Sequence, residues 1–129
     1  MWEMDARQTG SERAQIIIAE HHPLAREALS DLLVGDGHRV LQAGNATSAI
    51  SCVNQNKNVA VILTDLEMPG WQSFVSHSLA VAPKAFTIAM CGADSLVDPD
   101  ELRRRGIKFW LVKPIAYEEL QRAIKSRNT

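Results

Sequence analysis

Four groups of side chains that could do chemistry stand at the ends of apolar runs in this sequence. They are Glu20-His21-His22, Asp65, Cys91 and Lys113. Carboxylates and imidazoles bind divalent cations, and a lysine ammonium attracts anionic groups such as phosphate. In open α/β sheets, sites lie outside the carboxyl ends of the strands. We therefore expect these side chains to meet at one edge of a sheet.

The apolar runs themselves have the composition of strands. We expect strands over residues 16–19, 39–43, 59–64, 86–91 and 107–112. The runs at 16–19 and 59–64 are almost continuously aliphatic, which is typical of strands buried on both faces.

Helical patterns alternate with these strands. Pro23 suits a first helical turn, Asn45 is a predicted N-cap, and Asp98 is a second one with Glu101 closing a capping box. The expected helices cover residues 24–34, 46–53 and 71–79, the segment from 99 onward, and residues 117–124. Five strands alternating with five helices predict an α/β fold with a doubly wound parallel sheet covered on both faces.

Composition narrows the class of protein. The chain has 129 residues, with 14 Lys and Arg against 15 Asp and Glu, so nothing suggests the basic field of a nucleic-acid binder. Cys52 and Cys91 form no Cys-x-x-Cys pair. From the polar N-terminal residues and the short apolar runs we expect no signal peptide and no membrane span. We expect one cytoplasmic domain over residues 15–127, preceded by a tail or short extra helix over residues 1–14.

Three segments carry a resemblance to a known family. They are residues 16–24 (IIIAEHHPL), residues 65–70 (DLEMPG) and Lys113-Pro114. With this spacing the sequence resembles the receiver domains of bacterial two-component response regulators, over nearly the whole chain. The resemblance implies a five-stranded parallel sheet in the order 2-1-3-4-5 with five helices.

The resemblance also implies roles for individual residues. Asp65 matches the aspartate that accepts a phosphoryl group from the phosphohistidine of a sensor histidine kinase, and Lys113 matches the lysine that pairs with that group. Glu20, Asp65 and the backbone carbonyl of Glu67 match the ligands of Mg²⁺. Attack of a carboxylate on a phosphohistidine builds negative charge, which a metal ion and a lysine would neutralise.

Three more positions are assigned only by register with the family. Cys91 falls where a serine or threonine contacts the phosphoryl group, and Trp110 falls on the aromatic position that rotates on activation. Both would belong to the switch. Pro114 matches the proline that commonly follows a cis peptide bond.

Two positions depart from the family pattern. His21 replaces the second of two adjacent acids, and Mg²⁺ takes imidazole poorly, so we expect weak Mg²⁺ binding. Glu20, His21 and Asp65 could instead bind another divalent cation such as Mn²⁺ or Zn²⁺. Cys91 offers a thiol, a weak donor, and is otherwise a small buried apolar side chain. We expect His22 to point away from His21 and to serve the turn or cap.

The functional prediction is a stand-alone receiver domain, or a receiver portion of a larger protein, with no enzymatic activity beyond its own phosphorylation and dephosphorylation. Its partners would be a histidine kinase or phosphotransfer protein and a downstream protein, without nucleic acid or membrane. Contacts, including any homodimer, would use the surface of Arg103–Arg105 and residues 117–121. A pseudo-receiver that binds proteins without phosphorylation is the alternative. A flavodoxin-like cofactor binder is disfavoured because no glycine-rich phosphate loop follows residues 16–19.

Overall fold

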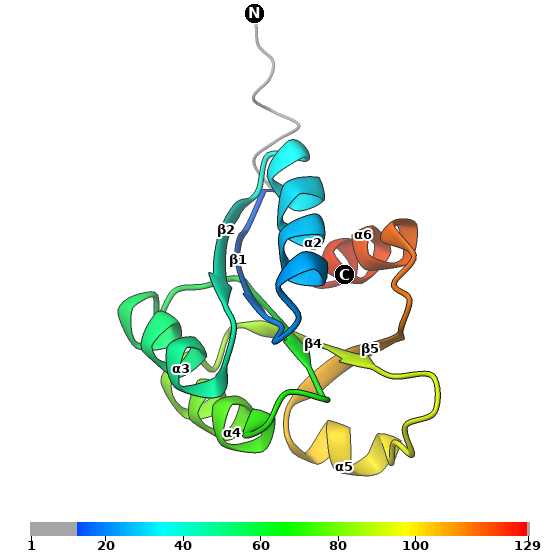
Figure 1. Cartoon of the computed structure of the whole chain (residues 1–129). Coiled ribbons are helices and arrows are strands. Elements are labelled where there is room, and N and C mark those ends of the chain that lie inside the picture. The colour runs from blue at the N-terminus through cyan, green and yellow to red at the C-terminus, as the bar shows by residue number, and fades with distance from the viewer. Residues whose placement is uncertain (1–12, 129) are drawn as a thin grey trace, which may run out of the picture.

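The computed structural model describes residues 13–128, and the first strand begins at Gln15. Within these residues five parallel strands form one sheet in the order β2-β1-β3-β4-β5 (Figure 1). The strands are β1 (Gln15–Ala19), β2 (Arg39–Ala43), β3 (Val61–Asp65), β4 (Phe86–Cys91) and β5 (Ile107–Val112). The predicted strand order is confirmed.

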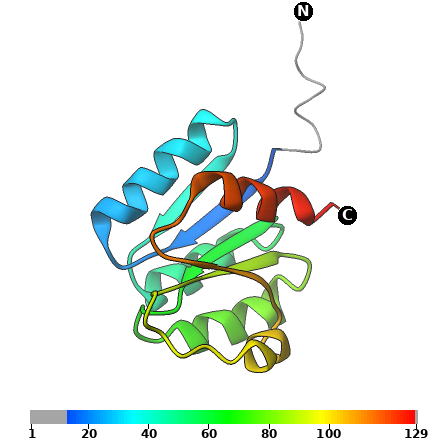
Figure 2. The ribbon, with the colours of Figure 1, turned by 90° about the vertical axis from the view of Figure 1, so that its right-hand side faces the viewer.

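Five helices in the described part of the chain cover the two faces of this sheet. They are α2 (Pro23–Gly35), α3 (Ala46–Gln55), α4 (Trp71–Val81), α5 (Pro99–Arg104) and α6 (Tyr117–Ser126). Helices α2 and α6 lie on one face, and α3, α4 and α5 lie on the other (Figures 1 and 2). The fold is therefore the doubly wound α/β arrangement that the alternation of strands and helices predicts.

The core divides according to the pleat of the strands. In β1, Ile16 and Ile18 pack on the side of α2 and α6, whereas Ile17 and Ala19 pack on the side of α3 and α4. All four are fully buried. A central parallel strand is covered on both faces, which is why this segment is apolar throughout rather than alternating.

The helix ends largely follow the predicted signals. The Asn45 side chain accepts a hydrogen bond from the Ser48 amide, and Asp98 caps α5 by accepting from the Asp100 amide. The capping box at α5 was a wrong prediction. The Glu101 carboxylate instead forms an ion pair with Arg105, one helical turn later, at 3.0 Å.

The bounds of one predicted strand also differ in the structure. The strand expected over residues 59–64 is Val61–Asp65, because Val59 still belongs to the turn after α3 and donates its amide to the Asn56 carbonyl. Asp65 is therefore the last residue of β3 and pairs in register with Met90 of β4. The tail or extra helix expected over residues 1–14 lies, except for its last two residues, outside the described residues.

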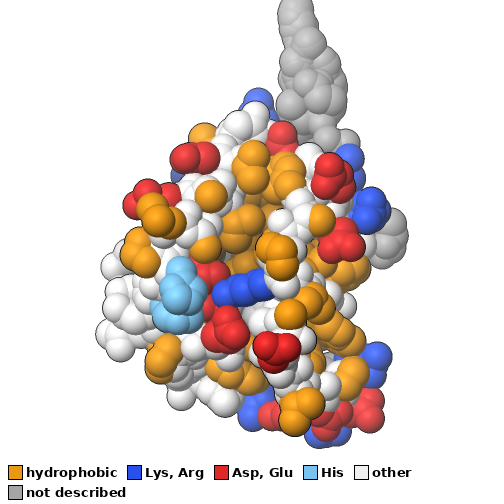
Figure 3. Space-filling view, turned by 45° about the vertical axis from the view of Figure 1, so that its right-hand side comes forward, with side chains coloured by type: hydrophobic (Ala, Val, Ile, Leu, Met, Phe, Trp, Pro, Cys, Tyr) orange, Lys and Arg blue, Asp and Glu red, His pale blue; other side chains and the backbone are white. Residues whose placement is uncertain are grey.

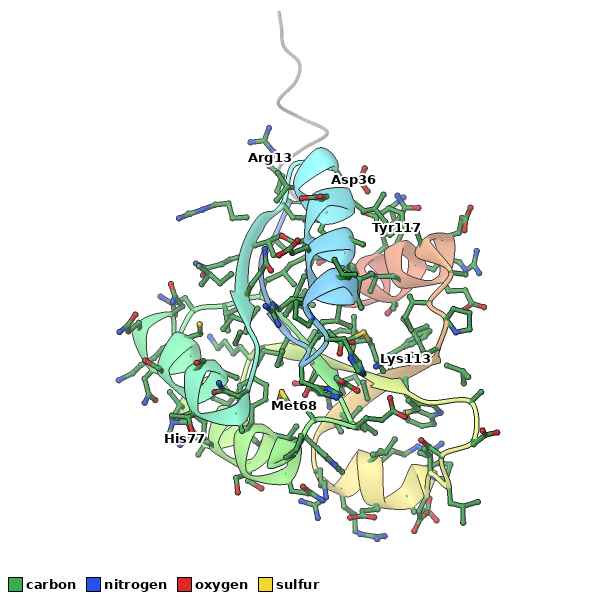
Figure 4. The ribbon with its side chains drawn as sticks, in the orientation of Figure 1. Arg13, Asp36, Met68, His77, Lys113 and Tyr117 are labelled. Carbon is green, nitrogen blue, oxygen red and sulfur yellow. The ribbon has the colours of Figure 1, made fainter. Side chains whose placement is uncertain are left out.

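A polar contact joins the two helices on one face of the sheet. The Tyr117 hydroxyl at the start of α6 lies 2.7 Å from Asp36 Oδ2 and 3.0 Å from the Leu32 carbonyl oxygen, both near the end of α2 (Figure 4). Gln121 also donates to Asp36, and both hydrogen bonds lower the pKa of Asp36. The hydroxyl thus connects α6 to α2.

Replacing Tyr117 by phenylalanine is expected to lower the free energy of unfolding by about 1 kcal/mol, the usual loss for one hydrogen bond. Urea unfolding followed by circular dichroism measures it. Because the Asp36 pKa is lowered in the folded state, this part of the stability is present above the ordinary carboxyl pKa and is lost as the pH falls through the folded value. An equal loss at pH 7 and at pH 2 would contradict the contribution of Asp36.

Candidate functional site

Asp65 lies at the carboxyl edge of the sheet with its side chain completely buried. Its Oδ1 accepts hydrogen bonds from the Glu67 amide at 2.9 Å and from Lys113 Nζ at 3.1 Å. Its Oδ2 lies 2.7 Å from His21 Nδ1. The Glu67 amide comes from the turn after β3, Lys113 directly follows β5, and His21 lies just after β1. Three separate connections therefore hold one carboxylate in place.

Glu20 is the second buried carboxylate of the site, with 1% of its surface exposed. Its Oε2 accepts a hydrogen bond from the His22 amide at 3.1 Å. Its Oε1 forms an ion pair with Lys113 Nζ at 3.1 Å, and no hydrogen bond to this oxygen is found among the described residues. The Lys113 ammonium therefore balances the charge of this buried oxygen.

Lys113 forms ion pairs with both Asp65 and Glu20, and these contacts shift the pKa values of all three groups. Burial would lower the pKa of Lys113, but Asp65 and Glu20 raise it above its ordinary value. Burial would raise the pKa of Asp65, but the Glu20 carboxyl, the Glu67 amide, Lys113 and His21 lower it. The pKa of Glu20 is raised, first by burial and then by Asp65. Asp65 therefore carries the negative charge, and a proton taken up by the pair would reside on Glu20.

The two histidines lie side by side at this edge, contrary to expectation. Their ring centroids are 4.1 Å apart with the planes inclined at 38°. The prediction that they point to opposite sides was wrong because side-chain alternation applies within a strand, and β1 ends at Ala19. His22 is the N-cap residue of α2, as expected, although its side chain makes no capping hydrogen bond. His21 lies in the pocket, against Asp65.

The Glu67 side chain was not expected in the site. Only its carbonyl was assigned from the sequence, yet its Oε1 lies 3.4 Å from Lys113 Nζ. Gly92, after β4, allows this placement, since a Cβ there would clash with Glu67 Oε2. The Cys91-Gly92 pair at a strand end was the only sequence signal for such a close approach.

The remaining candidate residues line the same edge. Cys91 ends β4 and is buried, and burial raises the pKa of its thiol, as do Asp65 and Glu67, so the thiol is neutral. Trp110 in β5 is half-buried, with the Arg103 guanidinium 5.4 Å from its ring centroid. The Lys113–Pro114 peptide bond is cis.

The donor atoms fit a magnesium site poorly. Mg²⁺ prefers near-octahedral oxygen coordination. Both oxygens of Asp65 already accept hydrogen bonds from protein groups, and an imidazole lies against Oδ2. The Lys113 ammonium lies 3.1 Å from the Glu20 oxygen that has no hydrogen bond. We therefore assign no chemical step to Mg²⁺ in this chain.

Comparison with known proteins gives the family. Residues 16–125 match the model of the response regulator receiver domain. Protein PilH of Pseudomonas aeruginosa is 29% identical over 117 residues, which cover 88% of this chain and 96% of PilH. The sensor histidine kinase AruS of the same species is 30% identical over 118 residues, which cover 85% of this chain but only 12% of AruS. The chain thus spans a small part of some relatives and nearly all of another.

Solved structures share the fold at low sequence identity. A response regulator receiver domain protein from Clostridium thermocellum has a TM-score of 0.82 at 24% identity, covering 88% of this chain and 93% of that one. The receiver domain of a Pseudomonas aeruginosa sensor histidine kinase, solved with magnesium in its active-site cleft, has a TM-score of 0.78 at 21% identity, covering 90% and 98%.

A third structure pairs a receiver domain with a phosphotransfer partner. It is the Saccharomyces cerevisiae complex of the histidine phosphotransfer protein Ypd1 with the receiver domain of Ssk1, with a TM-score of 0.76 at 16% identity, covering 87% of this chain and 86% of that one. The family match over residues 16–125, the strand order and the buried aspartate at the end of β3 agree. This chain belongs to the response-regulator receiver domain family of two-component signalling.

Proposed function

We propose that residues 15–127 form a receiver domain that accepts a phosphoryl group on Asp65 from the phosphohistidine of a kinase or phosphotransfer protein. The observation that carries the proposal is the buried Asp65 carboxylate, held at the carboxyl edge of the sheet with the Lys113 ammonium 3.1 Å from its Oδ1. Phosphorylation would then be read by a downstream protein.

The proposed reaction is the transfer of a phosphoryl group from a histidine to Asp65. A carboxylate oxygen of Asp65 bonds to phosphorus while the bond from phosphorus to the donor imidazole breaks, and the donor leaves as a neutral histidine after taking up a proton. Lys113 balances charge on the phosphoryl oxygens. Either oxygen of Asp65 must give up a hydrogen bond in order to react, so we expect transfer from small phosphodonors to be slow.

Surface features support a partner that docks beside Asp65. Leu24, in the first turn of α2, is 82% exposed. A groove of about 400 Å³ runs between α2 and the segment after β5. Its lining combines Glu20, His22 and Lys113 of the site with apolar side chains that include Ala25, Ala28, Leu29, Leu32 and Ile115. A phosphohistidine on an amphipathic helix could reach Asp65 while the apolar face of that helix covers this groove.

Leu24→Lys is expected to slow phosphotransfer from a cognate kinase by roughly tenfold or more, because it places a charge in an apolar contact next to the site. Transfer from acetyl phosphate should be unchanged. Val34→Lys is the matched control, since Val34 is 55% exposed on the same helix but about 15 Å further along it. Equal slowing by both variants would contradict this docking surface.

One observation favours the alternative, a pseudo-receiver that binds its partner without phosphorylation. The His21 imidazole already occupies the side of Asp65 where the family carries an acid, at 2.7 Å. The two functions separate in one experiment. Incubation with a phosphorylated, co-encoded kinase should transfer label to wild type and not to Asp65→Asn; stable kinase binding without any transfer would establish the pseudo-receiver.

We infer that α5, β5 and α6 form the output surface. Cys91 lies on β4, between the strand of Asp65 and β5, and Trp110 of β5 packs against the cluster that includes Leu102 of α5. A phosphoryl group adds about −1 to −2 charge at Asp65, which these side chains would sense. Amide exchange with and without phosphorylation should change in β5 and α6. Changes confined to α2 would contradict this assignment.

A further inference from the structure

The side chains of Glu20, His21 and His22 converge at the carboxyl end of β1. One ligand atom from each residue lies within 4.8 Å of the others. The two imidazole rings are in tilted contact, and the His21 side chain is 31% exposed. Figure 3 shows a histidine patch on this surface beside carboxylates and a basic side chain. An ion could therefore enter from solvent without a change of fold.

Two features of the cluster indicate a metal ligand set rather than a chance grouping. The His21 ring is oriented by the buried Asp65 carboxylate at Nδ1, and among the described residues its Nε2 has no hydrogen-bonding partner. Histidines that bind metals commonly donate their other ring nitrogen to a carboxylate in this way. Independently, Oε2 of the buried Glu20 accepts a hydrogen bond only from the His22 amide among the described residues, so this oxygen keeps a lone pair for a cation.

We propose that Glu20, His21 and His22 bind one transition-metal ion of the Zn²⁺ type. Two imidazoles and one carboxylate form a set that suits Zn²⁺ and not Mg²⁺, and three protein ligands leave a fourth position for water. Metal binding at this site requires no phosphorylation of Asp65, so it is a property separate from the proposed function. It still touches that function, because the Asp65 carboxylate that orients His21 is the proposed phosphoacceptor.

Lys113 sets a limit on this site. Its ammonium lies 3.1 Å from Glu20 Oε1 and would repel a cation bound to that oxygen. Oε2, which accepts a hydrogen bond from the His22 amide and forms no ion pair with Lys113, is the oxygen with room for the ion. The affinity for Zn²⁺ should therefore be below that of a closed structural site.

Isothermal titration of the untagged protein with ZnCl₂, and separately with MgCl₂, tests the proposal. We expect one equivalent of Zn²⁺ to bind, and His22→Gln to weaken it at least tenfold, on the scale of losing a metal-site partner. His22 does not contact Asp65, so this variant keeps the His21–Asp65 hydrogen bond. Thermal unfolding without metal should show the same Tm for His22→Gln and wild type.

His77→Gln is the matched control. His77 lies on α4, away from Lys113 and the site, and is hydrogen-bonded to Asn54 at 2.6 Å (Figure 4). It should bind Zn²⁺ like wild type. No Zn²⁺ binding by wild type, or equal binding by wild type and His22→Gln, would overturn the proposal. Either result leaves phosphorylation of Asp65 open, because no phosphodonor enters the titration.

Discussion

Replacing His21 by aspartate is expected to raise the affinity for Mg²⁺ by roughly 10- to 100-fold, the range seen when a partner of a metal site is gained or lost. The imidazole lies 2.7 Å from Asp65 Oδ2 and 3.6 Å from Glu20 Oε2. A carboxylate in its place would put three acids around one point, which favours a hard divalent cation. It would also free Asp65 Oδ2 from its hydrogen bond.

Titration of wild type and His21→Asp with MgCl₂ measures this effect. His21→Asn serves as the control, because it removes the imidazole without adding a charge and should gain much less. His22→Asp tests whether the place of the new carboxylate matters, because it adds the same charge at an exposed residue that makes no contact with Asp65. If Mg²⁺ bound equally to wild type and His21→Asp, His21 would not stand where the metal-binding acid belongs.

Replacing Lys113 by methionine is expected to lower the free energy of unfolding at pH 7 by about 2 to 3 kcal/mol. Removing one partner of a buried ion pair costs more than this, but the Lys113 side chain is 21% exposed and solvent reduces the loss. The buried Asp65 and Glu20 would then face each other without a cation. Lys108→Met, at an exposed position of β5, the strand that precedes Lys113, should change stability by less than about 0.5 kcal/mol.

The pH dependence of the Lys113→Met loss follows from the pKa shifts. The pKa of Asp65 is lowered in the folded state, so its stabilisation is present above the ordinary aspartate pKa and is lost as the pH falls through the folded value. The pKa of Lys113 is raised, so its contribution is lost as the pH rises through the folded value. The loss should be largest between about pH 5 and pH 10. A constant loss from pH 2 to pH 8 would contradict the ion-pair origin.

The sequence was a good guide to the fold because the signals for it are local. Continuous aliphatic runs occur where strands are buried on both faces, as in β1 and β3. Asn45 and Asp98 cap the helices that they precede. The alternation of strands and helices then leaves few possible topologies. The strand order itself came from the resemblance to the family rather than from the local patterns.

The site was harder to predict because its contacts are not local. The 2.7 Å contact between His21 and Asp65 joins residues 44 positions apart, and nothing in the local pattern encodes it. The contact between the His21 and His22 rings depends on where β1 ends, and the alternation of side chains cannot be extended beyond that point. The ion pair of Glu67 with Lys113 depends on the absence of a side chain at Gly92.

The measurement that tests the central claim most directly is the intact mass of the protein after incubation with a phosphorylated cognate histidine kinase. The account predicts a gain of one phosphoryl group in wild type, removed by hydroxylamine as expected for an acyl phosphate, and no gain in Asp65→Asn. A wild-type mass that stays unchanged while the kinase transfers phosphate to an unrelated receiver would contradict phosphoryl acceptance by Asp65. Phosphoryl acceptance by Asp65 would also be contradicted if Asp65→Asn gained the phosphoryl group as readily as wild type.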